Sequence, residues 1–252
     1  MVALNQVKDD RINQTIGWLQ KKVSEANAQG LIVGVSGGID SAVAANLIKR
    51  AFPQRSMGLI IPINSHNQDV EDGIAVVKTA GLSHAVLDLT QEHQSMMIKV
   101  MNVLSEEKNI SAESQRLSDA NLRARIRMSA LYAIANALNY MVVGTDNAAE
   151  LYTGYFTKYG DGGVDLLPLG KLLKSEVVQW AKELGVPEQV IMRPPSAGLW
   201  EGQTDEAEMG ITYDAIDAFL SGNQISDENY ARLQSMHEKT EHKRKLPPLP
   251  EY

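Results

Sequence analysis

The chain has 252 residues, of which 44% are hydrophobic, so it can bury the core of one large α/β domain spanning residues 1–252. It carries 24 basic and 31 acidic side chains, a net charge of −7, and no basic run longer than residues 242–245, which argues against extended nucleic-acid binding. The absence of cysteine excludes disulfides and a cysteine nucleophile and fits a cytoplasmic protein. No signal peptide is visible and no apolar run approaches the roughly 20 residues that span a bilayer, so we expect no membrane partner.

The first predicted elements are a helix, a strand and a second helix. Apolar residues three and four apart predict an amphipathic helix over Asp10–Ala28. The short run of mostly branched apolar residues over Leu31–Val35 predicts a strand buried on both faces of a parallel sheet. Helical spacing resumes over Ile39–Arg50.

The residues that join this strand to this helix read Ser-Gly-Gly-Ile-Asp-Ser and predict a phosphate-binding loop. Its two glycines tolerate a tight turn, and the helix start directs backbone N–H groups and a positive dipole end at the same point. Ser36 and Ser41 add hydroxyl groups. The carboxylate of Asp40 is unfavourable beside an anion unless a cation lies between them, so Mg²⁺ is implied. An ordinary βα turn is the alternative, but a turn does not require this set of residues.

The middle of the chain alternates predicted strands and helices. The expected fold is a Rossmann-like open parallel sheet with helices on both faces. The predicted strands cover Met57–Ile61 and Ala85–Leu89, the helices cover Asp69–Gly81 and Thr90–Glu107, and a polar connection covers Lys108–Ser118.

A long helix is predicted over Asp119–Asn139. Apolar and small residues occupy most of its circumference, so we expect it to pack against more than the sheet, with a subunit interface as the second surface. Arg123 and Arg127 share one face of it, whereas Arg125 points about 200° away from Arg123. An arginine on a mainly apolar helix needs either an anionic partner or a ligand, and the sequence leaves both open.

A fourth strand, over Tyr140–Thr145, leads into a second informative stretch. Ligands of open parallel sheets lie beyond the carboxyl ends of the strands, so Thr145 and Glu150 are expected to face the same crevice as the first loop. Glu150 and Asp40 would then complete a Mg²⁺ site with phosphate oxygens and water. The glycine-rich stretch 157–165 predicts a mobile loop over a substrate, with a plain surface loop as the alternative.

The last third of the chain is predicted to be helical with one broken loop. Lys174 lies in the first turn of a helix over Leu172–Leu184, where a cation opposes the helix dipole, so a nearby phosphate is expected. A loop rich in proline and glycine covers Arg193–Gln203, and two more helices cover Ile216–Leu220 and Glu228–His237.

Several motifs together resemble known enzymes. The string S-G-G-x-D-S after a strand resembles the pyrophosphate loop of the ATP-pyrophosphatase superfamily, and it lacks the lysine of the Walker pattern. The strings G-T-D-x-A-A-E, T-G-Y-F-T-K-Y-G-D-G-G-x-D and P-L-x-K-L-x-K-x-E follow in order and are similar to ammonia-dependent NAD synthetase, over about residues 10 to 248. The resemblance implies an adenine nucleotide alpha hydrolase-like fold. It also implies ATP-dependent amidation of deamido-NAD (nicotinic acid adenine dinucleotide) to NAD, through an acyl adenylate and with release of AMP and pyrophosphate.

The resemblance also implies roles for residues at the motif positions. Asp161 and Lys174 are catalytic, and the carboxylate of Asp161 is placed to attract ammonium and take its proton. Asp40 and Glu150 hold Mg²⁺. Ser196 stands where the family often has threonine, but it keeps the hydroxyl group. The implied ATP contacts are Gly34, Val35, Ser36, Gly37, Gly38, Ile39, Asp40, Ser41, Thr145, Lys174 and Ser196, and the implied deamido-NAD contacts are Arg125, Lys158, Asp165, His242 and Lys243.

The nitrogen source and the competing functions also follow from the resemblance. Glutamine-dependent relatives carry a glutaminase domain with a cysteine nucleophile, so a chain of this length without cysteine should use ammonia. A homodimer is expected from the family. The alternatives are another amide-forming synthetase, similar to GMP synthetase, or a nucleotide-binding sensor without catalysis. The match over residues 154–165 disfavours the first, and the retention of Asp40, Glu150, Asp161 and Lys174 together disfavours the second.

Overall fold

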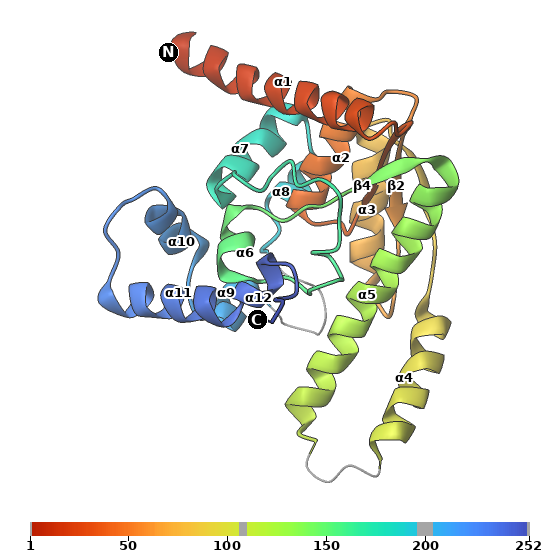
Figure 1. The fold of residues 1–252 in the computed structure, drawn as a ribbon. Helices are drawn as coiled ribbons and strands as arrows, with labels where there is room; N and C mark the ends of the chain where they lie inside the picture. The colour runs from red at the N-terminus through yellow and green to blue at the C-terminus, as the bar shows by residue number, and fades with distance from the viewer. Residues whose placement is uncertain (1, 106–109, 196–203, 251–252) are drawn as a thin grey trace.

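A computed structural model describes residues 2–105, 110–195 and 204–250 of the chain (Figure 1). Its centre is a sheet of four parallel strands in the order β3-β2-β1-β4, which confirms the predicted open parallel sheet. A parallel bridge between Val143 and Leu166 adds a short contact beside β4. The strands are β1 (Gly30–Gly34), β2 (Ser56–Ile60), β3 (Ser83–Val86) and β4 (Tyr140–Val143).

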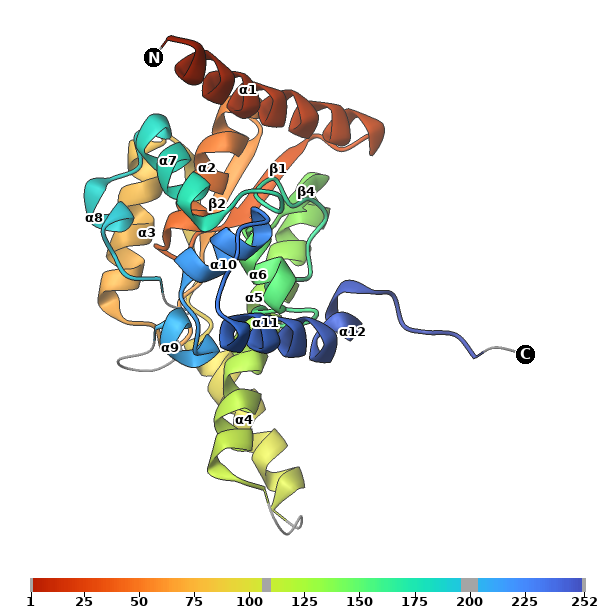
Figure 2. The same ribbon diagram turned by 90° about the vertical axis from the view of Figure 1, so that its left-hand side faces the viewer.

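Helices cover both faces of the sheet, as the apolar run of β1 predicts (Figures 1 and 2). Leu31 and Val33 belong to the hydrophobic core on one face, and Ile32 between them belongs to the core on the other. This alternation is the two-residue period of a strand that is buried on both sides. The first face is packed by α1 (Val2–Glu25), α2 (Ile39–Ala51), α3 (Asn67–Thr79) and α7 (Lys174–Leu184), and the second by α5 (Ala112–Leu138), with α4 (Thr90–Leu104) alongside it.

Several element boundaries differ from the predicted ones. Helix α1 begins at Val2. Strand β3 begins at Ser83 and ends at Val86, whereas the predicted strand covers Ala85–Leu89. Part of the stretch predicted as a polar connection is helical, because α5 begins at Ala112. Ser111 caps α5 by accepting the backbone N–H of Ser114 at 3.0 Å. The first turns of α5 are exposed on all sides, so they have no apolar face for a periodicity analysis to find.

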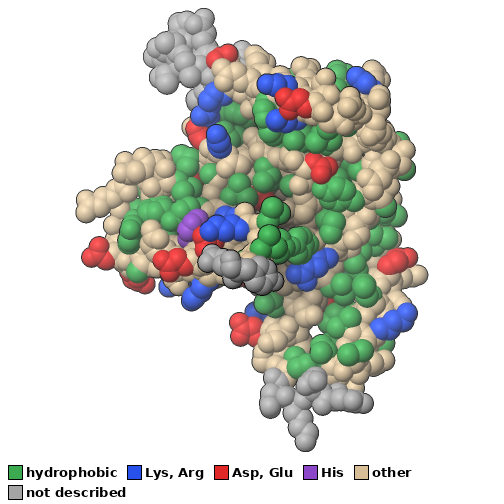
Figure 3. Space-filling model, in the orientation of Figure 1, with side chains coloured by type: hydrophobic (Ala, Val, Ile, Leu, Met, Phe, Trp, Pro, Cys, Tyr) green, Lys and Arg blue, Asp and Glu red, His purple; other side chains and the backbone are tan. Residues whose placement is uncertain are grey.

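Helices α4 and α5 run side by side and project from the body of the molecule (Figures 1 and 2). Within this single chain α5 is fully buried only at Ala120 and Ala135, so α4 and the sheet together leave much of its circumference partly exposed. Hydrophobic side chains lie on the surface of this part of the molecule (Figure 3). The large ones that are at least half exposed on α4 and α5 are Met96, Ile98, Val103 and Leu117.

All but one of the remaining helices build a smaller cluster beside the sheet. Its buried apolar residues include Ala149, Ile216 and Leu233. Four of the remaining helices have four to six residues, too few for an apolar period, and were not predicted. None of the helices in the described part of the chain is both long and apolar enough to cross a bilayer. The helices of this cluster are α6 (Ala148–Thr153), α9 (Asp205–Met209), α10 (Tyr213–Leu220), α11 (Asp227–Lys239) and α12 (Glu241–Arg244), whereas α8 (Glu188–Ile191) packs with α2 and α7 on the first face of the sheet.

The turn after β1 depends on a glycine, which can be tested by mutation. Gly37 has φ +85, and a Cβ atom there would lie 2.6 Å from the carbonyl oxygen of Asp69. Gly222 has φ +78 with nothing within 4 Å of the same position. Both Gly→Ala variants bear the left-handed backbone cost, so we expect Gly37→Ala to lose a further ~1–3 kcal/mol of unfolding free energy from the clash. Urea unfolding measures the difference, and equal losses in the two variants would contradict the close approach.

Candidate active site

The candidate site lies at the carboxyl ends of β1 and β4. The chain places β2 and β3 on one side of β1 and β4 on the other, so the order of the sheet reverses between β1 and β4. Open parallel sheets bind ligands at such a point. A cavity of about 440 Å³ lies there. The predicted residues that line it are Gly34, Val35, Ser36, Gly38, Ile39, Asp40, Ser41, Thr145, Glu150, Asp161, Lys174 and Lys243.

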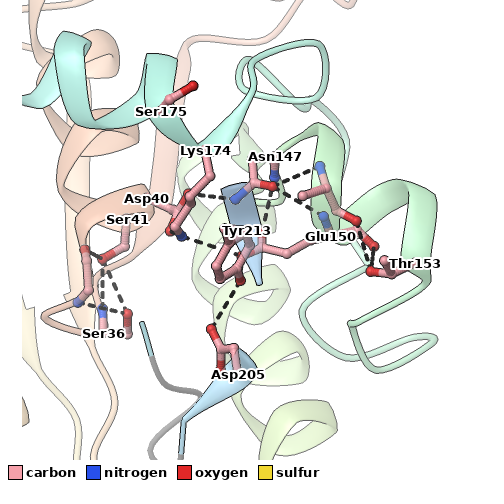
Figure 4. Close-up of polar contacts among 12 residues, drawn as sticks. Ser36, Asp40, Ser41, Asn147, Glu150, Thr153, Lys174, Ser175, Asp205 and Tyr213 are labelled. Carbon is pink, nitrogen blue, oxygen red and sulfur yellow. Dashed lines mark hydrogen bonds and ion pairs between the residues drawn. The ribbon is translucent and has the colours of Figure 1, made fainter. Parts of the chain in front are cut away.

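Hydrogen bonds of its own serines fix the conformation of the loop after β1 (Figure 4). The hydroxyl of Ser41 donates to the carbonyl oxygen of Gly38 at 2.8 Å and accepts the backbone N–H of Ser36 at 3.2 Å. The hydroxyl of Ser36 lies 3.2 Å from that of Ser41 and accepts the N–H of Gly38 at 3.3 Å. Helix α2 begins directly after this loop, and the first N–H groups of a helix have no acceptor within it. The arrangement suits a bound anion.

Three charged side chains meet beside this loop (Figure 4). The ammonium group of Lys174 lies 2.5 Å from Asp40 Oδ2 and 3.7 Å from Glu150 Oε1. The Lys174 side chain is only 7% exposed. Burial opposes its charge, but Asp40 and then Glu150 outweigh burial and raise the pKa of Lys174. The phosphate expected beside Lys174 is therefore not needed to explain its charge, since carboxylates of the chain itself provide the counter-charge.

Glu150 is positioned by the start of α6. Its Oε2 accepts the backbone N–H of Asn147 at 3.0 Å, while the side-chain oxygen of Asn147 accepts the N–H of Glu150, a capping box. The side-chain amide of Asn147 also donates to Asp40 Oδ1 at 2.9 Å, so it ties the two acids together. Burial, and then the negative charge of Asp40, raise the pKa of Glu150 to about 8. Burial and the neighbouring acid therefore both disfavour the charged form of Glu150.

Tyr213, Asp205 and Asp217 support this arrangement, although none of them is among the predicted site residues. The hydroxyl of Tyr213 lies 3.3 Å from Glu150 Oε1 and 3.1 Å from Asp205 Oδ2. Asp217 accepts the backbone N–H groups of Lys174 at 3.0 Å and of Ser175 at 2.9 Å, so a carboxylate from α10 caps α7. Sequence reasoning missed Tyr213 and Asp217 because each contacts a residue far away in the chain.

Two more carboxylates line the cavity near the glycine-rich stretch. Asp161 Oδ1 accepts the backbone N–H of Thr157 at 3.0 Å, and the hydroxyl of Thr157 donates to Asn121 of α5 at 2.8 Å. Asp161 as a whole residue is exposed, but burial of its carboxylate raises the pKa of Asp161. Asp146 is 4% exposed, and its Oδ2 has no hydrogen-bond partner among the described residues. Burial, and then the charge of Asp161, raise the pKa of Asp146.

Of the predicted deamido-NAD contacts, one lines the cavity and the others lie outside its lining. Lys243 lines the cavity, and its ammonium group donates to the carbonyl oxygens of Gly154 at 2.7 Å and Phe156 at 2.6 Å. Arg125, Lys158 and His242 lie together but outside the cavity lining. Arg125 Nε donates to the carbonyl oxygen of Lys158 at 3.3 Å, and Lys158 Nζ donates to that of His242.

Asp165 and Ser196 are the remaining predicted residues. Asp165 also lies outside the cavity lining, where it accepts the hydroxyl of Tyr132 at 2.9 Å and the backbone N–H of Val142 at 2.8 Å. Ser196, predicted to contact ATP, lies outside the described residues.

The cap on α7 predicts a measurable effect on stability. Asp217→Ala leaves two backbone N–H groups of α7 without their acceptor, so we expect a loss of ~1–3 kcal/mol in the free energy of unfolding. Asp214→Ala, at an exposed position of the same helix, serves as the control and should cost less than ~0.5 kcal/mol. Chemical unfolding of the two variants gives the comparison. A loss for Asp217→Ala no larger than that of the control would show that the cap is not needed.

The chain matches known proteins along almost its whole length. The family model described as NAD synthase matches residues 11–247. The NH(3)-dependent NAD(+) synthetase of Alkaliphilus metalliredigens (strain QYMF) is 54% identical over 240 residues, which cover 95% of this chain and 97% of that relative.

Two solved structures share the fold over nearly their full lengths. The NMN synthetase from Francisella tularensis superposes with a TM-score of 0.90 at 37% identity, covering 97% of this chain and 99% of that one. The NH3-dependent NAD synthetase from Campylobacter jejuni subsp. jejuni NCTC 11168 superposes with a TM-score of 0.77 at 28% identity, with the same coverage. On the family model over residues 11–247 and a relative that is 54% identical, the chain belongs to the NAD synthase family.

Proposed function

We propose that the chain is a ligase that joins ammonia to the nicotinate carboxylate of deamido-NAD, with ATP as co-substrate and NAD, AMP and pyrophosphate as products. The observation that supports this best is the shared cavity. The phosphate loop, the Asp40 and Glu150 pair and the carboxylate of Asp161 all line it. An anion site, a cation site and a proton acceptor are the three things that this reaction needs in one place.

The chemistry explains why ATP is required. A carboxylate does not react with ammonia at neutral pH, because hydroxide is a poor leaving group. An oxygen of the nicotinate carboxylate therefore attacks the α-phosphorus of ATP, and the bond to the pyrophosphate breaks. Ammonia then adds to the carbonyl carbon of the acyl adenylate, and AMP departs with the oxygen that came from the carboxylate. The reaction therefore balances, with the amide, AMP, pyrophosphate and one proton as products.

The residues of the first loop take the leaving pyrophosphate in this scheme. Ser36 and Ser41 present hydroxyl groups, and the start of α2 presents backbone N–H groups. Lys174 lies beside them and can move part of its charge interaction from Asp40 to the phosphate oxygens. Asp161 holds incoming ammonium and takes its proton, since only neutral ammonia has the lone pair that attacks.

Asp40 and Glu150 are the proposed Mg²⁺ ligands, and their surroundings fit a cation. The ammonium group of Lys174 already lies within 3.7 Å of both carboxylates. The described residues contain no group of three or more His, Cys, Asp or Glu side chains arranged for a metal, so phosphate oxygens and water are expected to complete the site. When bound, Mg²⁺ would neutralise negative charge that moves onto the pyrophosphate.

The identity of the nucleotide substrate has a second candidate. NMN synthetase from Francisella tularensis is a structural neighbour with a TM-score of 0.90. NMN is the nicotinamide half of NAD, so the same amidation on nicotinic acid mononucleotide would need only part of the deamido-NAD site. The contacts assigned to Arg125, Lys158, Asp165, His242 and Lys243 stay a prediction.

The expected homodimer is also part of this proposal. The half-exposed apolar residues of α4 and α5, among them Ile98 and Val103, support an interface on these helices. The cluster of Arg125, Lys158 and His242 lies outside the cavity lining, so a long substrate could reach it across two subunits. The cytoplasmic location expected from the sequence stays a prediction.

One assay tests the reaction. The purified chain is mixed with Mg-ATP, ammonium chloride and either deamido-NAD or nicotinic acid mononucleotide, and the amide product, AMP and pyrophosphate are measured together. We expect equal amounts of all three with deamido-NAD and much less product with the mononucleotide. Glutamine in place of ammonium should give little product. Equal rates with glutamine and ammonium, or no amide from either substrate, would contradict the proposal.

Asp161→Asn separates the two half-reactions. The variant keeps the oxygen that accepts the N–H of Thr157 but loses the base, so we expect amide formation to fall ~10²- to 10⁴-fold. Exchange of labelled pyrophosphate into ATP, which needs deamido-NAD but not ammonia, should persist. An unchanged rate of amide formation would remove Asp161 from the mechanism.

A further inference from the structure

One cation of the cavity has neither a role in the reaction as proposed nor an ion pair with a described carboxylate. Four basic side chains line the cavity: Arg127, Lys174, Arg193 and Lys243. Lys174 and Arg193 form ion pairs with carboxylates, and Lys243 donates to two backbone carbonyl groups. Arg127 forms no ion pair with any described carboxylate. A partly buried guanidinium in this situation suits an anion that arrives with a ligand.

The contacts of Arg127 fix its position and leave donors unused. Its Nε donates to the carbonyl oxygen of Ile61 at 3.0 Å, and Nη2 donates to the hydroxyl of Ser65 at 3.4 Å. A guanidinium has five N–H donors, so three have no acceptor within the described part of the chain. Burial, and then the charge of Arg123, lower the pKa of Arg127 to about 10, so the group stays charged at neutral pH.

The carbonyl group of Ile61, which accepts the Arg127 hydrogen bond, lies next to the phosphate-binding loop. Ile61 directly follows β2, which pairs in parallel with β1, and β1 leads into the loop that holds Ser36. Neighbouring strands lie ~4.8 Å apart, so the carbonyl group that holds Arg127 is about one strand away from the loop. On α5, Ala124, Met128 and Leu131 share the side of the helix with Arg127 and line the same cavity.

We propose that Arg127 binds the α-phosphate of ATP and of the acyl adenylate, through paired N–H to oxygen hydrogen bonds. This inference takes the identity of its ligand from the proposed function. The loop holds the outer two phosphates, so the α-phosphate lies beside it, toward the group that ammonia attacks. The nicotinate carboxylate and the α-phosphate repel each other as they approach, and a fixed guanidinium lowers that repulsion. Arg127 is thus a substrate-binding residue that the motifs did not identify.

The test compares AMP, which carries the α-phosphate, with magnesium pyrophosphate and deamido-NAD, neither of which contains that phosphate of ATP. Arg127→Met removes the charge at similar length, and Arg127→Lys keeps the charge without the planar fork. Arg55→Met is the control, because Arg55 is exposed beside the opposite end of β2. Binding of AMP, magnesium pyrophosphate and deamido-NAD is measured separately by calorimetry, together with the melting temperature of each unliganded variant.

We expect Arg127→Met to weaken AMP binding ~10- to 100-fold, Arg127→Lys to weaken it less, and pyrophosphate binding to change less than ~3-fold in both. Three results would overturn the proposal. The first is unchanged AMP binding with weaker deamido-NAD binding, which would assign Arg127 to the nicotinate carboxylate. The second is an equal loss for every ligand together with a lower melting temperature, which marks a structural role. The third is an equal effect of Arg55→Met.

The binding measurements and the reaction assay test the inference and the proposed function separately. Should the wild-type chain form no amide from any substrate, the proposed function fails, while AMP binding that depends on Arg127 would still support the adenylyl-phosphate site. Should the chain make NAD with AMP binding indifferent to Arg127, the function stands and this inference fails.

Discussion

Two partly buried carboxylates and one buried ammonium group form the interaction on which the rest of the site depends. Asp40 and Glu150 approach each other at the ends of neighbouring strands, and Lys174 lies between them. Removing one of these three close charges would leave the others without their counter-charge, so each side chain helps to hold the other two in place. Each comes from the first turn of a different helix, α2, α6 or α7, and the three helix starts therefore point at one cavity.

This convergence has an electrostatic consequence. Helix starts favour acidic side chains, and Asp40 and Glu150 both lie in first turns. Lys174 opposes the dipole of α7, and Asp217 compensates by binding the first N–H groups of that helix. Negative phosphate groups and a divalent cation can then exchange contacts with Lys174 and the acids without leaving a charge unpaired. In the unliganded chain Lys174 and the two acids contact one another, and under the proposed function Mg-ATP would take over part of these contacts.

Much of the fold and part of the site could be predicted from the sequence. Branched apolar runs marked the strands, and the rule that ligands lie beyond strand ends brought Asp40 and Glu150 together correctly. What could not be predicted depends on contacts between distant segments. The Asn147 to Asp40 bond joins residues 107 apart, and the Asp217 cap spans 43 residues, so no local pattern reveals either. The sequence allows either an anionic side chain or a ligand as the partner of Arg127. Sequence spacing cannot distinguish them, because it does not show whether a carboxylate lies close enough for an ion pair.

The adenylate route is tested most directly by the fate of oxygen. Deamido-NAD labelled with ¹⁸O in its nicotinate carboxylate is converted with Mg-ATP and ammonium chloride, and the products are examined by mass spectrometry. If the carboxylate attacks the α-phosphate, one labelled oxygen must appear in AMP and none in pyrophosphate. Label found in pyrophosphate or released only to water, with AMP unlabelled, would contradict the assignment of the loop, Lys174 and the paired acids to this reaction.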